Sequence, residues 1–461
     1  MQEHIEKNPL GSAPIPRLMI NFAIPSIIAM LIGALYNIVD QLFIGQSVGT
    51  LGNAATNVAF PLTTISVALA LLFGVGGAAC FNLDMGRGKP DQAIRYIGNS
   101  VSMLILSGIV LLLVTEIFLT PLLRFFGSPD EVLPYAQTYV KIIAIGFPFL
   151  ILTTGGGHII RADGSPNMAM LCSLVGAIIN VFLDAWFVMG LGLGMAGAAY
   201  ATIIGQIVSG IMVICYVRKF KTVPLKAVHL IPRISLITKM AATGMANCFT
   251  QLSMLVVQIV MNNSLTYYGA QSVYGESIPL ACVGIVIKVS QIFFSVVIGL
   301  SQGSVPIESF NYGAKQYDRV REAYLFAAKL GIAICVVSFV IFQTLPRQIL
   351  MLFGDNTELY FEFGIKFFRI FLFMTWINAL QPITTNLFSA IGKPKKGVFL
   401  ALTRQIIFLM PLILILPLFM GIYGLMYASP IADAGAAVAA ILMARKEFKL
   451  MRQEEAGMQT A

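Results

Sequence analysis

Gly86-Arg-Gly-Lys-Pro-Asp91, a turn followed by a basic helix start, returns in the second half of the chain as Gly313-Ala-Lys-Gln-Tyr-Asp318. Two further pairs keep the same offset to within one position: Leu122-Leu-Arg-Phe-Phe-Gly127 with Ile349-Leu-Met-Leu-Phe-Gly354, and Gly164-Ser-Pro166 with Gly392-Lys-Pro394. Matches that hold one register over most of a chain indicate an internal duplication. The sequence therefore predicts two halves with the same fold.

The composition places both halves in a membrane. Of the 461 residues, 57% are hydrophobic and 11% are charged, whereas soluble domains carry about 25% charged residues. A membrane-spanning helix needs roughly 20 consecutive apolar residues. Twelve stretches meet this requirement: 18–43, 54–82, 97–119, 138–160, 168–189, 193–217, 241–265, 278–303, 324–345, 363–387, 398–420 and 422–444.

The expected fold is an all-α polytopic membrane protein of twelve transmembrane helices in two pseudo-symmetric six-helix bundles. Because six is an even number, both halves enter the membrane in the same direction, so the axis that relates them lies along the membrane normal. The expected parts are an N-terminal tail (1–17), an N-lobe with spans one to six (18–217), a basic linker (218–239), a C-lobe with spans seven to twelve (240–445) and a C-terminal tail (446–461).

Positive charge predicts the orientation. If the N-terminus is cytoplasmic, 23 of the 30 Lys and Arg residues fall on the cytoplasmic side of these spans, as positively charged loops usually do. Both termini and the linker are therefore expected in the cytoplasm, with the chain in the cytoplasmic (inner) membrane. The same bias explains most of the net charge of +9, so no nucleic-acid partner is expected.

Two equivalent bundles facing a central cavity are typical of transport by alternating access. A channel needs a filter of backbone or charged groups, and no loop has that character. The sequence also has no Walker-type phosphate loop, no metal-ligand spacing and no nucleophile motif. The expected protein is a secondary transporter and not an enzyme, without a cofactor, whose partners are a small organic molecule and the lipid bilayer. A monomer is expected.

Four motifs carry a family resemblance: Leu35-Tyr-Asn-Ile-Val-Asp40-Gln-Leu-Phe-Ile-Gly45, Gly86-Arg-Gly-Lys-Pro-Asp91, Arg161-Ala-Asp-Gly-Ser-Pro166 and Gln302-Gly-Ser-Val-Pro-Ile-Glu-Ser-Phe-Asn-Tyr-Gly313. Together they resemble the multidrug and toxic compound extrusion (MATE) family, most of all its DinF-like branch, which includes MepA-type drug pumps. The resemblance covers essentially the whole chain. It implies a multidrug exporter that exchanges organic, mostly cationic and amphipathic, compounds for H⁺ or Na⁺.

Two other transporter classes share part of this pattern. The major facilitator superfamily also has two six-span halves, but its Asp-Arg signature after span two is absent from the 86–92 turn. A lipid-linked saccharide flippase, or another lipid-type flippase of the wider superfamily, is the main alternative. Such flippases usually have more spans and a strongly cationic cavity, for which only Lys288 is a good candidate here.

Two carboxylates within the spans are the leading candidates for ion coupling. A charged side chain inside a span costs roughly 2.5–3.5 kcal/mol, so few are expected without a function. Asp40 in span one and Asp184 in span five lie at similar depth, and no cationic side chain lies at that depth in the same half. Repulsion and desolvation favour a proton on at least one of them. Oxygen ligands suit H⁺ or Na⁺ without discriminating between them.

The resemblance extends this pair to a network. In similar transporters the matching positions form the N-lobe cation site, here Asp40, Asn180, Asp184 and Thr202, with the backbone carbonyl of Ala198 and the side chain of Tyr139 as further members. For Asn180 and Thr202 taken alone, an ordinary interhelical hydrogen bond is the favoured interpretation. The equivalent C-half positions are Phe408, Leu412 and Pro430, so coupling is expected in the N-lobe.

The expected substrate cavity involves Tyr36, Asn37, Lys288 and Gln258. Lys288 either pairs with a C-half carboxylate such as Asp433 or selects the charge of the substrate. Arg404 is expected to extend toward the cytoplasmic surface, as long basic side chains near span ends do. The resemblance also implies that span one bends at Pro25, because a proline removes one helical hydrogen bond.

Overall fold

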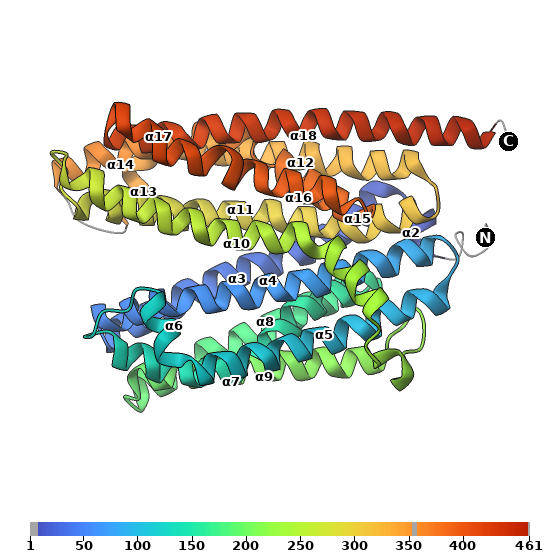
Figure 1. Cartoon of the computed structure of the whole chain (residues 1–461), viewed down its shortest axis with the longest axis horizontal. Helices are drawn as coiled ribbons and strands as arrows, with labels where there is room; N and C mark the ends of the chain where they lie inside the picture. Colours follow the sequence, from blue (N-terminus) through green and yellow to red (C-terminus); the bar gives the residue numbers. More distant parts are fainter. Residues whose placement is uncertain (1–7, 353–356, 460–461) are drawn as a thin grey trace.

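The computed structural model describes residues 8–352 and 357–459. Every element in these two ranges is helical. The helices form two bundles that lie side by side with their long axes nearly parallel (Figure 1). Residues 1–7, 353–356 and 460–461 lie outside the description, and with them Lys7, the ends of both expected tails and the last two residues of the 349–354 repeat match.

The N-terminal half forms one bundle, called here the N-bundle, and the linker. Its elements are α2 (Pro9–Ser12), α3 (Ile15–Ser47), α4 (Thr50–Gly86), α5 (Pro90–Ile117), α6 (Leu119–Phe125), α7 (Leu133–Ala162), α8 (Pro166–Asp184), the π-helix η1 (Ala185–Gly190), α9 (Gly194–Arg218) and the 3-10 helix η2 (Ala227–Leu230). The helix α3 continues without a break through Pro25.

The C-terminal half forms the C-bundle. Its elements are α10 (Ile234–Ala270), α11 (Ser277–Gly313), α12 (Tyr317–Thr344), α13 (Pro346–Met351), α14 (Glu358–Phe371), the 3-10 helix η3 (Thr375–Ile377), α15 (Leu380–Ala390), α16 (Pro394–Leu402), the π-helix η4 (Thr403–Leu409), α17 (Met410–Met420) and α18 (Ile422–Gln459). The last helix therefore continues well beyond the expected end of span twelve at residue 444.

The described residues contain eleven helices long and apolar enough to cross a membrane, or twelve if one bent pair counts as a span. This confirms the expected fold class. The tenth span, expected as one run over 363–387, is instead broken: Glu358–Ile377 and Leu380–Ala390 meet at an angle of 42°. Apolar composition alone does not distinguish a straight span from a bent one.

The duplication is visible in the helix bounds. Helices α4 and α11 are related by one offset at both their starts and their ends, and the same offset relates both ends of α5 to those of α12. The starts of α8 and α16, and of α9 and α18, keep this offset to within one position. The short turn after α4 and its equivalent after α11 also share a backbone conformation, because Gly88 and Lys315 both have positive φ values of 72° and 59°. The predicted repeat is therefore confirmed.

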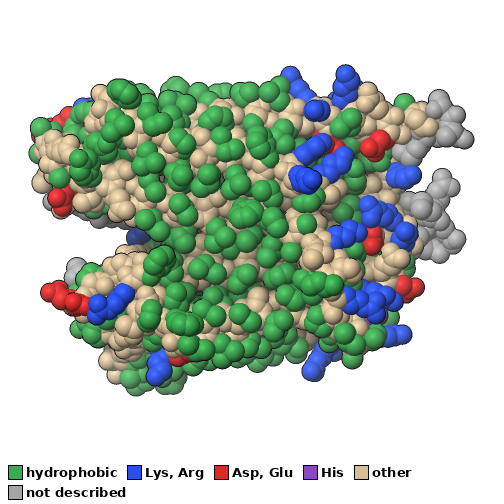
Figure 2. Space-filling view, viewed as in Figure 1, with side chains coloured by type: hydrophobic (Ala, Val, Ile, Leu, Met, Phe, Trp, Pro, Cys, Tyr) green, Lys and Arg blue, Asp and Glu red, His purple; other side chains and the backbone are tan. Residues whose placement is uncertain are grey.

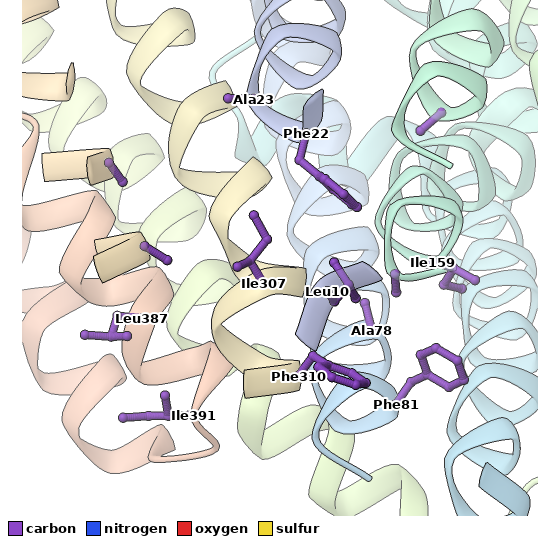
Figure 3. Close-up of a cluster of buried hydrophobic side chains, with 14 of the residues drawn as sticks. Leu10, Phe22, Ala23, Ala78, Phe81, Ile159, Ile307, Phe310, Leu387 and Ile391 are labelled. Carbon is purple, nitrogen blue, oxygen red and sulfur yellow. The ribbon is translucent and has the colours of Figure 1, made fainter. Parts of the chain in front are cut away.

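The two bundles share one hydrophobic core at one end and have separate cores at the other. The shared cluster includes Phe22 of α3, Phe81 of α4, Ile307 and Phe310 of α11 and Leu387 of α15, and Figure 3 shows these side chains lying across both bundles. Toward the opposite end, one cluster contains only N-bundle residues and another only C-bundle residues. The hydrophobic core that the two bundles share therefore lies at one end.

Close backbone contact holds that joined end. Helix α3 packs against α11, and α4 packs against α10. In each pair the first long helix of one half contacts the second long helix of the other half, as a repeat with two-fold pseudo-symmetry requires. A Cβ atom at Gly76 of α4 would lie 2.0 Å from the carbonyl oxygen of Met240, and one at Gly303 of α11 would lie 2.8 Å from the Cα of Ala23. At the other end the molecule is hollowed between the bundles, as Figure 2 shows at the left.

The linker between the bundles is held by the N-bundle. The Asp163 carboxylate accepts hydrogen bonds from the backbone N–H groups of Lys221 and Thr222, each at 2.8 Å. The side chain of Asn99 donates to the carbonyl of His229 at 3.1 Å and accepts from the N–H of Arg233 at 2.7 Å. These bonds fix the linker up to the residue before α10.

Candidate functional site

Asp40 of α3 and Asp184 at the end of α8 are brought together inside the N-bundle. Their side chains are buried, with 7% and 0% of their surfaces exposed, and the two carboxyl groups are close enough to act on one another electrostatically. In the described ranges no donor reaches Oδ1 of Asp40 or either oxygen of Asp184. Helix α8 changes to the π-helix η1 immediately after Asp184, and such π segments often occur at functional sites.

The other expected members of the network surround this pair. Asn180 lies one turn before Asp184 and beside its carboxyl group, and its Nδ2 donates to Oγ1 of Thr202 at 3.3 Å. The buried Tyr139 of α7 is close enough to interact electrostatically with both carboxyl groups, and so is Tyr36 of α3. Ala198, one turn before Thr202 on α9, is fully buried.

The side chains at this site offer a cation carboxyl, hydroxyl and amide groups as ligands. Carboxylate, hydroxyl and amide oxygens are ligands for hard cations, and a close carboxyl pair also holds a single proton well. The donor set therefore fits either H⁺ or Na⁺. The arrangement can take up one positive charge inside an otherwise apolar bundle.

Polar side chains of α3 and α11 line the hollow between the bundles. Asn37 and Lys288 are exposed, although both lie within apolar helices. The Nζ of Lys288 donates to Oε1 of Gln41 at 3.2 Å, which bridges the two bundles one residue after Asp40. A Cβ atom at Gly33 or Gly284 would meet no atom within 4 Å, so both glycines border open space.

Gln258 of α10 is also exposed. Tyr36 differs from the expectation of a cavity residue, because it is half-buried and faces the carboxyl pair as well. Gln41, which contacts Lys288, was not among the expected residues. Its position one residue after Asp40 on the same span is the signal that could have found it.

Of the two alternatives for Lys288, pairing with Asp433 is wrong, and the expected position of Arg404 is also wrong. Nε of Arg404 lies 2.6 Å from Oδ1 of Asp433, and both side chains are largely buried. The other oxygen of Asp433 accepts from Asn378 at 3.2 Å and from Ser429 at 3.3 Å. Arg404 therefore turns into the C-bundle to neutralise Asp433, which leaves Lys288 free for the hollow.

The buried ion pair of Arg404 and Asp433 is expected to matter for stability. Asp433→Asn leaves the Arg404 guanidinium buried without its counter-charge, which is expected to destabilise the protein by about 3–5 kcal/mol. The midpoint of thermal unfolding of the purified protein in detergent measures the effect. Asp130→Asn is the matched control, because Asp130 pairs with Arg124 on an exposed surface, where a pair contributes about 0–1 kcal/mol. Equal shifts for the two variants would contradict the prediction.

Two equivalent helical bundles, joined at one end and hollowed at the other, with a buried carboxyl pair beside the hollow, define a membrane transporter that works by alternating access. The chain belongs to the MatE family, whose model matches residues 25–186 and 246–415. This confirms the family resemblance of the motifs.

Individual relatives agree with this family over nearly the whole chain. The multidrug export protein MepA of Staphylococcus saprophyticus is 23% identical over 429 residues, which are 92% of each chain. The fold is similar to that of a MATE protein solved in complex with MaL6, at 20% identity and a TM-score of 0.89, covering 98% of this chain and 99% of that one. It is also similar to an outward-facing multidrug resistance MATE family transporter of the MOP superfamily, at 21% identity and a TM-score of 0.87, with 98% of each chain covered.

Proposed function

We propose that this chain is a multidrug exporter that moves small organic molecules out of the cell in exchange for an inward-moving H⁺ or Na⁺. The buried pair of Asp40 and Asp184 beside the hollow carries the proposal. Membership of the MatE family and similarity to a multidrug export protein support the substrate class. They do not favour a lipid-linked saccharide flippase.

Exchange follows from competition for negative charge. A cation bound to the carboxyl pair neutralises it, and a cationic substrate in the neighbouring hollow is then attracted less strongly. Release of the cation restores the charge and the affinity for the next substrate. The moving bodies in this scheme are residues 18–217 and 240–445, which rock about their shared core. Since both bundles belong to one chain, a monomer suffices.

The hollow faces the outside of the cell in this proposal. Lys and Arg side chains gather at the joined end of the molecule (Figure 2), where α2 lies and α18 ends (Figure 1). Positive charge marks the cytoplasmic side of membrane proteins. In this proposal both termini lie in the cytoplasm, and the conformation is outward-open.

The substrates are proposed to include molecules that carry a negative as well as a positive group. With Asp433 occupied by Arg404, Lys288 presents its ammonium group to the hollow beside the amides of Asn37 and Gln41. This one cation offers a partner for a substrate carboxylate or phosphate. Gln258 and Tyr36 are further candidates for substrate contact.

Dye export from proteoliposomes tests the function. A fluorescent cationic dye is followed while a pH gradient and a Na⁺ gradient are imposed separately, at equal membrane potential. Transport driven by one gradient supports exchange and identifies the ion. Dye movement that neither gradient drives, together with scrambling of a labelled lipid-linked saccharide, would contradict the proposal and favour a flippase.

A second experiment tests whether α3 bends at Pro25 during transport. Pro25→Ala restores the missing hydrogen bond within α3 and stiffens the helix that carries Asp40. Gradient-driven dye transport is expected to fall, with normal insertion into the membrane. Pro417→Ala in α17 is the control, because that helix proline lies in the other bundle. Wild-type transport by Pro25→Ala would contradict a role in bending.

A further inference from the structure

Glu308 is a buried carboxyl group outside the site already described. It lies on α11 five residues before the helix ends at Gly313, and 0% of its surface is exposed. Within residues 8–352 and 357–459, neither of its oxygens has a hydrogen-bond partner. An isolated ionised carboxylate in an apolar interior costs so much free energy that such groups take up a proton instead. Because Glu308 is buried and has no partner among these residues, its carboxyl group is suited to bind a proton.

The side chain faces a cluster of hydroxyl and amide groups inside the C-bundle. Helical periodicity places Glu308 on the same face of α11 as Ser301 and Ser304, and this face differs from the one on which Gly303 approaches Ala23 of the N-bundle. We call these groups the C-bundle polar cluster: Glu308, Ser301, Ser304, Tyr324, Thr384 and Asn386, all of them buried.

Hydrogen bonds tie the cluster together around the carboxyl group. Asn386 donates to Oγ of Ser301 at 2.7 Å, and the hydroxyls of Tyr324 and Thr384 are 2.9 Å apart. The hydroxyl of Ser304 lies beside Glu308 but donates to the carbonyl of Ser301 at 2.9 Å. These partners leave the Glu308 oxygens free to hold a proton.

Few ionisable groups face Glu308 from the neighbouring helices. Tyr324 of α12 interacts with it electrostatically, and α15 contributes no ionisable side chain. On α18 the buried Glu447 forms ion pairs with Lys393 and Lys396 at the start of α16. These two lysines are therefore already paired with another carboxylate. Among the residues that the structure describes, no basic side chain forms an ion pair with Glu308.

The residue equivalent to Glu308 in the N-bundle is apolar. At the offset that relates α4 to α11, Glu308 corresponds to Phe81, and Ser301 and Ser304 correspond to Gly74 and Gly77. Phe81 packs against Phe220 with ring centroids 5.5 Å apart. The fold does not need a carboxyl group here, because its other half fills the same place with a ring. In the C-bundle the cluster also includes α15, which follows the break at η3, and interrupted spans often border ion sites in transporters.

We propose that Glu308 and the C-bundle polar cluster form a second proton site, separate from Asp40 and Asp184, that binds and releases one proton in each transport cycle. A proton from water bonds to one carboxylate oxygen and leaves from the same oxygen, so each binding event adds one positive charge to the cycle. This role in transport rests on the proposed function of ion-coupled export. Proton binding by Glu308 does not depend on that function.

Infrared spectroscopy tests proton binding without any substrate. The full-length protein in lipid nanodiscs at pH 7 is expected to show carbonyl absorption of protonated carboxyl groups, and one component of this absorption is expected to disappear in Glu308→Gln. Glu447→Gln is the control, because Glu447 is ion-paired and contributes no such component. Identical absorption in wild type and Glu308→Gln would overturn the proposal, whatever the protein transports. If Glu308→Gln does not assemble, Glu308→Leu, which restores the apolar character of the Phe81 position, takes its place.

Stoichiometry tests the transport step. The pH gradient that just balances a known dye gradient in proteoliposomes gives the number of protons exchanged per dye molecule. Glu308→Gln is expected to retain dye export and to exchange one proton fewer, and Glu447→Gln to match wild type. An unchanged number in Glu308→Gln would overturn cycling of the proton. Loss of dye export in the wild type would contradict the proposed function, while the infrared result would still decide whether Glu308 binds a proton.

Discussion

Replacing Asp40 or Asp184 with asparagine is expected to lower gradient-driven dye export to the rate of protein-free vesicles. The amide keeps the shape of the carboxyl group but cannot take up and release a cation by changing its own charge. Since the two carboxyl groups are buried and act on one another, losing either one removes half of the charge that holds the ion. Dye fluorescence under the gradient that drives the wild type measures the effect.

Asp130→Asn is the control for this result, because Asp130 lies on an exposed surface paired with Arg124 and removing its charge leaves the site unchanged. Equilibrium binding of the dye to the purified variants separates a coupling defect from misfolding, since both asparagine variants are expected to bind dye. Gradient-driven export at the wild-type rate in either variant would show that the carboxyl pair is not the coupling site.

Gly76→Ala is expected to shift the protein out of the conformation described here. The added methyl group would lie 2.0 Å from the carbonyl oxygen of Met240, so α4 and α10 must separate at the joined end. Overpacking of this kind costs about 1–3 kcal/mol, which lowers the ratio of closed to open forms at that end by roughly 5- to 150-fold. Dye export should fall because the outward-open form becomes rare.

Spin labels placed at Arg87 and Lys315 in a cysteine-free chain measure this separation, since these residues are exposed in the turns after α4 and α11. The label-to-label distance is expected to increase in Gly76→Ala. Gly157→Ala is the control, because its Cβ would meet Arg161 only at 3.8 Å and the gain in helix propensity is the same. Equal distance distributions for both variants would contradict a closing role for the α4–α10 contact.

The duplicated fold could be predicted because short turns with the same residue pattern occur at equivalent places in both halves. Glycine and proline at 86–90, 164–166 and 392–394 end one helix and start the next, and their spacing survives even though the apolar residues between them have diverged. The helix bounds then follow the repeat closely. The span count also follows, since apolar length is a local property of the sequence.

The break in the tenth span and the pairing of Arg404 could not be predicted in this way. Residues 363–387 form one apolar run, and the bend at η3 depends on how α14 and α15 pack against other helices. Arg404 and Asp433 are 29 residues apart in sequence and lie on different helices, Arg404 within the π-helix η4. A long side chain near a span end gives no local indication of which way it turns.

For the candidate site, the sequence indicated which polar residues are unusual but not all of the contacts they make. Asp40, Asp184, Asn180 and Thr202 are brought together as expected from their depths. Glu308 lies within a family motif whose pattern does not by itself mark a buried carboxyl group. Its signal was available from the repeat, because a charged residue replaces Phe81 of the other half.

The attachment of the linker to the N-bundle determines where relative motion can be observed. Because Asp163 and Asn99 hold the linker as far as Arg233, this segment is attached to the N-bundle up to the start of α10. A fluorophore at the exposed residue Val228 would therefore serve as a fixed reference mark on one body. Its distance to a dye at position 87 would stay constant, while its distance to a dye at position 315 would report each opening and closing directly in a single molecule.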